Sequence, residues 1–555
     1  MQITLKKSRQ KFNLGQNEFV AAGGEGKVYR SGSTAFKIYH DVSKMIPIGK
    51  IDALTNIPYK NVLCPRDICV ENYHDIGFSM DYISDRIYLC WMYNEGWKQK
   101  NNIDIKTLIK LINIMRDTTI ALHKHSCVVG DYNELQFLVN KNFDNVYFCD
   151  TDSYQISGYP CTAIMDTVRD RTVKFGQFSD KTDWFGFAIV TIQLFLGIHP
   201  YQGNHPDFSR REVKELKLMD LNYSIFNKKV TLPKHAKNLS NIPSSIRSWY
   251  EAVLEQKDRS IPPEVNDNIQ VTAQSSYVIQ NNNSFNISEV ISLSENIIDA
   301  KVINGKIYCF TKTVIYEHKD KLFHTYINHK YDIIKFEYLP VIIEITPHIL
   351  GIRELYSSVQ EYSTKIEYTD YFIFDNMIYT VLDDKIIVHI PGILWSKKLI
   401  GNVFSNYQVF TNMIVQNVLG VPWLIIPNKD SIQQIAIKEL TNHRIIDANY
   451  NIGGSLKIAI IISEYKSKYY RNTIIFKDGY KLTQEQSSPN DSSNFCVLNK
   501  SVAAAIIEDE RLDLILDSGI KSVKDPPFDN TKKLFTDGVR VLMINANKIL
   551  HISMR

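Results

Sequence analysis

The stretch that decides the fold is Val129–Ser153, VGDYNELQFLVNKNFDNVYFCDTDS. It contains two short apolar runs of β-strand character, Phe137–Val139 and Val146–Cys149. Asp131 precedes the first run and Asp150 follows the second. A plain hairpin with solvated turn aspartates has this pattern. Two carboxylates delivered by strand ends to one cleft also suit a reaction that needs both a base and a metal anchor, and phosphoryl transfer from a nucleotide is the foremost of these.

A glycine-rich turn lies near the start of the chain, within residues 15–39. Hairpins use glycine routinely. Glycine also lets phosphate oxygens approach the backbone, a valine just beyond would cover an adenine ring, and a lysine on the next strand would reach the same phosphates. Strand alternation places that lysine, Lys37, on the same face as Ala35 and Tyr39. The residues expected to hold a nucleotide are Gly23, Gly24, Gly26, Val28 and Lys37.

Four helices are expected in the first half of the chain. Residues 43–56 form a short or broken helix, because Pro47 interrupts them. Apolar residues at helical spacing predict an amphipathic helix over 103–124 and a further helix over 244–256. A strongly apolar helix is predicted over 182–196. The long connection before it, residues 155–181, has no periodicity, as is common for functional loops.

The composition is that of a globular chain with several domains. A length of 555 residues predicts about two to four domains. The formal net charge of +4 argues against a general role in nucleic-acid binding. The longest apolar run, 185–198, is too short to span a bilayer, and the chain opens with polar residues, so neither a membrane segment nor a signal peptide is expected. The eight cysteines lack metal-site spacing and predict free thiols in a reducing compartment, the cytoplasm, or the host cytoplasm for a viral source.

Taken together, residues 15–263 resemble the protein kinase fold, in the divergent form of bacterial and phage kinase-like proteins whose metal segment reads D-x-D-S. AAGGEGKVY is similar to the kinase glycine-rich loop, VGDYNELQ to the catalytic loop and DTD to the metal segment. The resemblance implies that Lys37 contacts phosphate, Asp131 is the base and Asp150 is a magnesium ligand. It also implies that Asp183 holds the catalytic-loop backbone. Arg259, in DRSIPP, resembles the late arginine of the same fold.

The fold class implied is a bilobal α+β kinase-like domain over 1–263, with an N-lobe of about 1–80 and a C-lobe of about 84–263. The implied function is an ATP- and magnesium-dependent protein kinase, more in the manner of a Ser/Thr kinase. A pseudokinase acting as a scaffold is the alternative. A small-molecule phosphotransferase of the aminoglycoside type is the third reading, because such enzymes share the G-D-x-x-x-x-N pattern.

Several positions depart from the kinase pattern. Gln136 stands where the second metal-binding asparagine belongs, and Asn133 replaces the lysine beside the transferred phosphate. We still place Gln136 on the metal and Asn133 in the catalytic loop. Gly130 replaces the arginine that would pair with a phosphorylated loop. No glutamate occurs between Lys37 and Pro65, so Asp52 is the substitute partner expected for Lys37.

The second half of the chain has a different character. Residues 264–286 are polar and predict a linker. Over 287–555 short apolar strands alternate with turns, and the apolar runs return about every 40 residues. This period predicts a β-propeller of six or seven four-stranded blades, with a pair of sandwiches as the structural alternative. By analogy with other propellers, this half is expected to recognise a protein substrate or partner.

Overall fold

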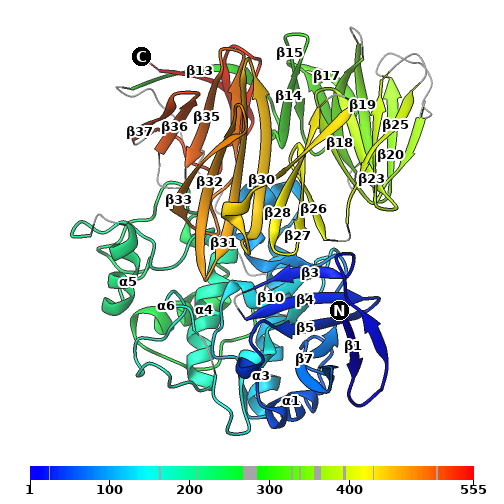
Figure 1. Ribbon diagram of the computed structural model, residues 1–555. Coiled ribbons are helices and arrows are strands. Elements are labelled where there is room, and N and C mark those ends of the chain that lie inside the picture. The colour runs from blue at the N-terminus through cyan, green and yellow to red at the C-terminus, as the bar shows by residue number, and fades with distance from the viewer. Residues whose placement is uncertain are drawn as a thin grey trace. The chain divides into compact units, whose positions relative to one another are not determined.

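The computed structural model describes residues 1–23, 25–161, 164–208, 211–266, 284–326, 329–336, 339–354, 364–391, 395–404, 406–428, 430–507, 511–524 and 526–554. The chain divides into two compact units, Met1–Ser275 and Ser276–Arg555, which Figure 1 colours from blue to green and from green to red. The division falls within the expected linker, most of which, residues 267–283, lies outside the described residues.

Unit 1 begins with a seven-stranded antiparallel sheet in the order β2-β1-β6-β7-β5-β4-β3. Its strands are β1 Gln2–Leu5, β2 Lys11–Asn13, β3 Phe19–Ala22, β4 Gly26–Ser31, β5 Thr34–Tyr39, β6 Asp67–Glu71 and β7 His74–Asp81. One side of the sheet buries an apolar cluster that includes Ile3, Phe19 and Phe36. The short helix α1, Ile48–Thr55, follows the 3₁₀ turn η1, Val42–Lys44, and Pro47 separates the two, which confirms the broken helix predicted here.

Helices dominate the rest of unit 1. They are α2 Glu95–Lys100, α3 Ile105–Lys124, α4 Asp180–Leu196, α5 Arg211–Leu221 and α6 Ser244–Glu255. The ranges of α3, α4 and α6 confirm the three longer helices predicted from periodicity, and α2 and α5 are additional. Helix α4 is buried along nearly its whole length, begins with a capping box between Ser179 and Thr182, and ends at Gly197, whose φ is 73°.

Two small sheets lie between these helices. One has the order β11-β10-β8 and the other pairs β12 with β9. Their strands are β8 Ile87–Tyr88, β9 Cys127–Val128, β10 Phe137–Val139, β11 Val146–Phe148 and β12 Gln155–Ile156. The expected hairpin is therefore present, with Phe137 opposite Phe148.

Unit 2 consists of seven four-stranded antiparallel sheets in its described residues. Six of them are consecutive runs of four strands. These are β14 Asp299–Ile303, β15 Lys306–Phe310, β16 Val314–Glu317 and β17 Asp320–His324; β18 Lys330–Phe336, β19 Leu339–Thr346, β20 Ile349–Glu354 and β21 Thr364–Glu367; β22 Asp370–Phe374, β23 Met377–Leu382, β24 Lys385–Ile390 and β25 Ser396–Asn402; β26 Tyr407–Phe410, β27 Met413–Val418, β28 Val421–Asn428 and β29 Ser431–Ala436; β30 Arg444–Gly453, β31 Leu456–Tyr465, β32 Lys468–Phe476 and β33 Tyr480–Ser487; β34 Phe495–Leu498, β35 Val502–Ile507, β36 Arg511–Leu516 and β37 Gly519–Lys524.

The seventh sheet joins the two ends of unit 2. Its order is β13-β40-β39-β38, with β13 Phe285–Ser292 from the start and β38 Leu534–Thr536, β39 Val541–Asn545 and β40 Lys548–Met554 from the end of the chain. Strand β13 pairs antiparallel with β40 from Phe285 opposite Met554 to Ser292 opposite Lys548. Figure 1 shows β13 beside the red C-terminal strands.

The seven sheets pack in a closed cycle. Seven buried apolar clusters each draw their residues from two sheets that follow one another along the chain, and one of them joins the sheet of β34 to the seventh sheet. Phe285 and Ile291 place β13 in two of these clusters. Each sheet thus buries both faces against its neighbours, which explains why apolar runs recur through this half.

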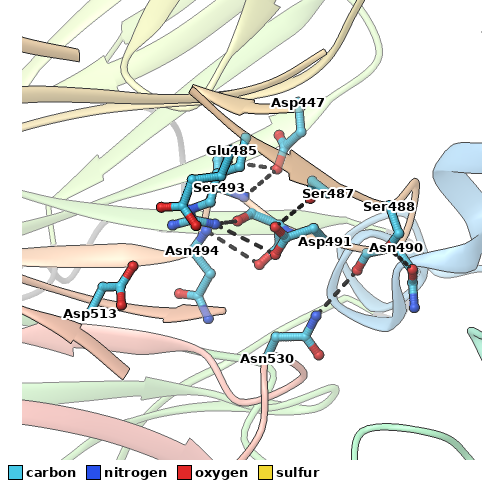
Figure 2. Close-up of polar contacts among 12 residues, drawn as sticks. Asp447, Glu485, Ser487, Ser488, Asn490, Asp491, Ser493, Asn494, Asp513 and Asn530 are labelled. Atoms are coloured by element: carbon cyan, nitrogen blue, oxygen red, sulfur yellow. Dashed lines mark hydrogen bonds and ion pairs between the residues drawn. The ribbon is translucent and has the colours of Figure 1, made fainter. Parts of the chain in front are cut away.

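A repeated polar residue stands at or near the start of the first strand in several sheets. Its side chain contacts a residue in or beside a neighbouring sheet of the cycle in each case. The contacts are Lys533 Nζ to Asp299 Oδ1 at 2.5 Å, Lys301 Nζ to Asp332 Oδ1 at 2.6 Å, Tyr407 Oη to Asp370 Oδ2 at 3.0 Å, Ser493 Oγ to Asp447 Oδ2 at 2.7 Å, and Asn494 Nδ2 to the Lys532 carbonyl at 2.6 Å. Figure 2 shows Asp447 and Ser493 facing each other, with Asn494 beyond them. These side chains fasten neighbouring sheets together.

Candidate functional site

The hairpin of β10 and β11 sets the two halves of the candidate site side by side. The peptide N–H of Cys149 donates to the carbonyl of Gln136 at 2.9 Å, so the end of the 3₁₀ turn η3, Glu134–Gln136, lies next to the residue before Asp150. Asp150 itself has a left-handed backbone, with φ 51° and ψ 35°, and leads into the 3₁₀ turn η4, Thr151–Ser153. Gln136 directly precedes β10 and Asp150 comes two residues after β11, so both lie at the same paired end of the hairpin.

Asp131 is a buried carboxylate in the loop before η3. Only 7% of the residue is exposed, and its Oδ1 accepts a hydrogen bond from the Met165 N–H at 2.9 Å. Burial raises the pKa of Asp131, the hydrogen bonds from Met165 and Asn133 oppose that rise, and the nearby charge of Asp150 adds to it. A carboxylate with a raised pKa is a stronger base than an ordinary aspartate.

The loop that carries Asp131 is held by Asp183 of α4. The two carboxylate oxygens of Asp183 accept from the N–H groups of Val129 and Gly130, each at 2.8 Å. His123 Nε2 lies 2.8 Å from the same carboxylate. Asp183 thus holds the backbone of the loop that carries Asp131, as expected.

Gly130 is required by its surroundings. Its φ is 75°, and a Cβ at this position would lie 2.5 Å from Cys161 Sγ. The space beside the position where the kinase pattern has arginine is therefore filled by the chain that follows η4. An arginine here would meet both a backbone and a packing obstacle.

Lys37 on β5 has two carboxylate partners. Its Nζ lies 2.5 Å from Asp152 Oδ2 and 3.1 Å from Glu25 Oε2. The hydroxyl of Tyr39 donates to the same Asp152 oxygen at 2.9 Å, which confirms that Lys37 and Tyr39 share a face of the sheet. Burial alone would lower the pKa of Lys37, but the charges of Asp152, Asp150 and Glu25 hold it well above its usual range.

The expectation that Asp52 is the partner of Lys37 is wrong. Asp52 lies on an exposed face of α1, where its Oδ1 is 3.2 Å from Nζ of Lys7. The carboxylate that reaches Lys37 instead comes from η4, two residues after Asp150. The D-x-D-S motif contains this residue, but its spacing alone does not indicate which strand it faces.

The glycine-rich turn separates β3 from β4. A Cβ on Gly26 would lie 2.4 Å from the Ile38 carbonyl oxygen of β5, whereas a Cβ on Gly23 would meet nothing within 4 Å. Gly24 lies outside the described residues. Val28 pairs with Lys37 across β4 and β5, so the two side chains stand on one face of the sheet. Gly26 is thus needed for strand packing, and Gly23 is the glycine with open space beside it.

Gln136 and Asn133 have different surroundings. Gln136 is 6% exposed, and its buried Oε1 has no hydrogen-bond partner among the described residues. Asn133 caps η3, because its Oδ1 accepts from the Leu135 N–H at 2.8 Å and its Nδ2 donates to the Asp131 carbonyl at 3.4 Å. An amide oxygen left without a donor is of the kind of oxygen ligand that Mg²⁺ prefers. Within the described ranges, His, Cys, Asp and Glu side chains do not gather in threes as a metal cluster would require.

A buried ion pair with Arg259 holds the segment between η4 and α4 at Asp170. Arg259 donates from Nε to Asp170 Oδ2 at 2.6 Å and from Nη2 to Asp170 Oδ1 at 2.8 Å. Neither the pairing nor Asp170 was anticipated from the sequence, although Arg259 was. A shallow hollow in this segment is lined in part by Ile164, Val168 and Phe178.

None of the eight cysteines is part of a disulfide, as expected from their spacing, and six of them are buried: Cys64, Cys69, Cys90, Cys127, Cys309 and Cys496. Among the residues that the structure describes, no helix combines the length and apolar character needed to cross a bilayer.

Comparisons with known proteins add a distant likeness. No family model matches the chain, and no curated protein matches it. Among solved structures, the yeast RNA polymerase II CTD kinase complex CTDK-1 is similar, with a TM-score of 0.30 and 16% sequence identity over 38% of this chain and 70% of that chain.

Proposed function

We propose that unit 1 is an ATP- and magnesium-dependent protein kinase with a kinase-like fold. The observation that carries the proposal is the β10–β11 hairpin, which pairs the backbone of Gln136 with that of Cys149, the residue before Asp150, while the Gln136 amide oxygen is buried without a hydrogen-bond partner among the described residues. The charge of Asp150 acts on both Lys37 and Asp131, so these three groups share one electrostatic environment. A base, a cation on a strand and oxygen ligands for a metal are the parts that phosphoryl transfer uses.

In this proposal each residue has one role. Lys37 binds phosphate oxygens, and Asp150 and Gln136 hold Mg²⁺. Asp131 accepts the proton of the substrate hydroxyl through Oδ2, because the Met165 N–H donates to Oδ1. Asn133 holds the loop in shape through its two backbone contacts. Gly23 and the neighbouring Gly24, with Val28, would line the nucleotide. ATP with Mg²⁺, when bound, supplies the phosphoryl group and neutralises its charge.

A protein substrate is favoured over a small molecule because the chain combines the helix that contains TDWFGFAI with the late arginine Arg259. Small-molecule phosphotransferases of the aminoglycoside type do not usually carry these features together.

The second candidate function is a nucleotide-binding pseudokinase. The Met165 N–H already occupies Asp131 Oδ1, and no lysine stands in the loop position taken by Asn133. Either feature would lower phosphate transfer while leaving the site of Lys37 and Asp150 able to bind.

For unit 2 we propose a seven-bladed β-propeller that recognises a protein partner. The seven sheets, the closed cycle of apolar clusters and the pairing of β13 with β40 support this arrangement, and seven separate sheets do not fit a pair of sandwiches. The recognition role rests on analogy with other propellers. The kinase would then act on what the propeller binds.

The kinase proposal is tested by Asp131→Asn and Asp150→Ala, with Asp144→Asn as a control on the exposed turn of the same hairpin. Asp131→Asn is expected to lower autophosphorylation or transfer to a protein extract by at least about 10²-fold, because the base is lost. It should keep the stabilisation by ATP with Mg²⁺ in a thermal-shift assay, about 2.7 kcal/mol at 100 times Kd. Asp150→Ala should lose the magnesium-dependent part of that stabilisation.

The outcomes separate the candidates. Transfer by Asp131→Asn at the wild-type rate would remove Asp131 as the base. Magnesium-dependent ATP binding without transfer by the wild type would favour the pseudokinase. Phosphate incorporated only into metabolites would favour the small-molecule enzyme.

A further inference from the structure

We propose that Asp152 is the positioning residue that holds the Lys37 ammonium in place. One short segment, Asp150 with the η4 turn that follows it, then carries both the metal ligand Asp150 and the anchor of the phosphate-binding lysine. This inference rests on the proposed function of the site. It gives the second aspartate of DTDS a role, where the sequence indicated one only for the first.

The geometry around Asp152 is that of an enclosed ion pair. The Asp152 side chain is 4% exposed and that of Lys37 is 11% exposed, and they meet at 2.5 Å. The Tyr39 hydroxyl donates to the same oxygen of Asp152. The other carboxylate near Lys37, Glu25, is 55% exposed, so it is screened by solvent. Asp152 is therefore the dominant partner.

The turn that presents Asp152 is itself fixed. The buried hydroxyl of Thr151 donates to the Leu63 carbonyl at 3.0 Å. The N–H of Ser153 and its hydroxyl both donate to the Asp150 carbonyl, at 3.0 and 2.9 Å. These hydrogen bonds tie the backbone of Asp150 and Asp152 into one turn.

Helix α1 offers no carboxylate to Lys37. Its two charged residues face elsewhere, because Asp52 pairs with Lys7 and the ammonium of Lys50 donates to the Pro160 carbonyl at 3.2 Å. The lysine and its anchor therefore meet without any rearrangement of α1. In this site the position of the η4 turn, and not that of a helix, determines where the Lys37 ammonium is held.

The inference is tested in the free protein by the reactivity of Lys37. Cyanate carbamylates only the unprotonated amine, and mass spectrometry reports each lysine separately. Asp152→Asn removes the charge that keeps Lys37 protonated, so carbamylation of Lys37 should rise about tenfold or more for each unit by which its pKa falls. Lys27 on β4 serves as the internal reference, and Asp52→Asn, a carboxylate of α1, as the matched control that leaves Lys37 unchanged.

A second readout uses ATP with Mg²⁺. Asp152→Asn should raise the KM for MgATP and lower the affinity for a fluorescent ATP analogue by about 10-fold or more, whereas Asp52→Asn should change neither. Asp152→Glu, which restores the charge, should recover part of the affinity. Lys37 reactivity in Asp152→Asn equal to that in Asp52→Asn would overturn the inference.

Two further outcomes are covered. If Asp152→Asn does not fold, the double variant Asp152→Asn/Lys37→Met decides: recovery of folded protein supports the pairing, and a double variant as unstable as the single one overturns it. If wild-type protein binds no nucleotide, the proposed function fails, yet the carbamylation result still judges whether Asp152 sets Lys37.

Discussion

Arg259 and Asp170 form a bidentate ion pair in unit 1. Their side chains are only 7% and 1% exposed. Removing the cation leaves a buried carboxylate without its partner, so Arg259→Met should lower the free energy of unfolding by about 3–5 kcal/mol. Arg169→Met is the control, since Arg169 pairs with Asp166, which is 64% exposed, and should cost no more than about 1 kcal/mol. Chemical denaturation of the three proteins measures this.

The same pair predicts a pH dependence. Burial by itself would raise the pKa of Asp170, but the hydrogen bonds and charge of Arg259 hold it below its usual range. The folded pKa is therefore lower than the unfolded one, about 3.9, so the stability that the pair contributes is present above that pH and is lost as pH falls through the folded pKa. The gap between wild type and Arg259→Met should close in acid. A gap that stays constant down to the acid transition would contradict this assignment.

The site residues proposed from the sequence are ones that stand beside a local signal. Asp131, Asp150 and Lys37 each stand beside a recognisable strand, loop or glycine turn, and Asp183 opens a helix. The partners Asp152 of Lys37 and Asp170 of Arg259 lie 115 and 89 residues away along the chain. Spacing within a motif contains no information about such pairs, which is why Asp52 was the wrong choice.

At the scale of elements, the β4–β5 pair depends on Gly26. A Cβ there would lie 2.4 Å from the Ile38 carbonyl oxygen, so Gly26→Ala must separate two strands or shift Lys37. We expect a loss of about 1–3 kcal/mol in the free energy of unfolding and weaker stabilisation by MgATP. Gly23→Ala, with open space around its Cβ, should leave the free energy of unfolding nearly unchanged. Equal losses in the two variants would show that the contact with Ile38 is not what requires glycine.

Long helices were predictable because their apolar period extends over several turns, as in α3. The helix α2 was not, since its six residues are too few to display a period, and α5, with 11 residues of which six are charged, was not predicted either. In unit 2 the strands were visible as apolar runs, yet the repeated Asp or Asn at the first strand was not, because its partners belong to the neighbouring sheet. The contact of Asp447 with Ser493 in Figure 2 is of this kind, and so is that of Asn494 with the Lys532 carbonyl.

At the scale of the whole molecule, unit 2 depends on β13 to complete its seventh sheet. Phe285 and Ile291 of this strand are 0% and 2% exposed. Deleting residues 284–292 from the full chain should lower the stability of unit 2 by on the order of 5 kcal/mol, since each buried side chain contributes about 1.5–3 kcal/mol. This corresponds to a fall in Tm of roughly 10–20 °C.

A synthetic peptide of residues 284–293 added to the deleted protein supplies the matching control. It should restore part of the lost Tm, and a scrambled peptide should not. An unchanged Tm after the deletion would mean that the pairing of β13 with β40 contributes nothing to the closure of the cycle.

The number of sheets could not be predicted from the sequence, because one sheet is assembled from both ends of unit 2 and has no continuous signature.

The pairing of β13 with β40 also has a consequence for biosynthesis. Strand β13 leaves the ribosome long before β40, and at about 5–20 residues per second the intervening residues take on the order of 10–50 s to be made. During that time β13 and the open face of the first sheet lack their final neighbours. Unit 1 can complete its fold on the nascent chain, while unit 2 can close only after its last strand has emerged, so this is the half for which chaperone protection during translation matters most.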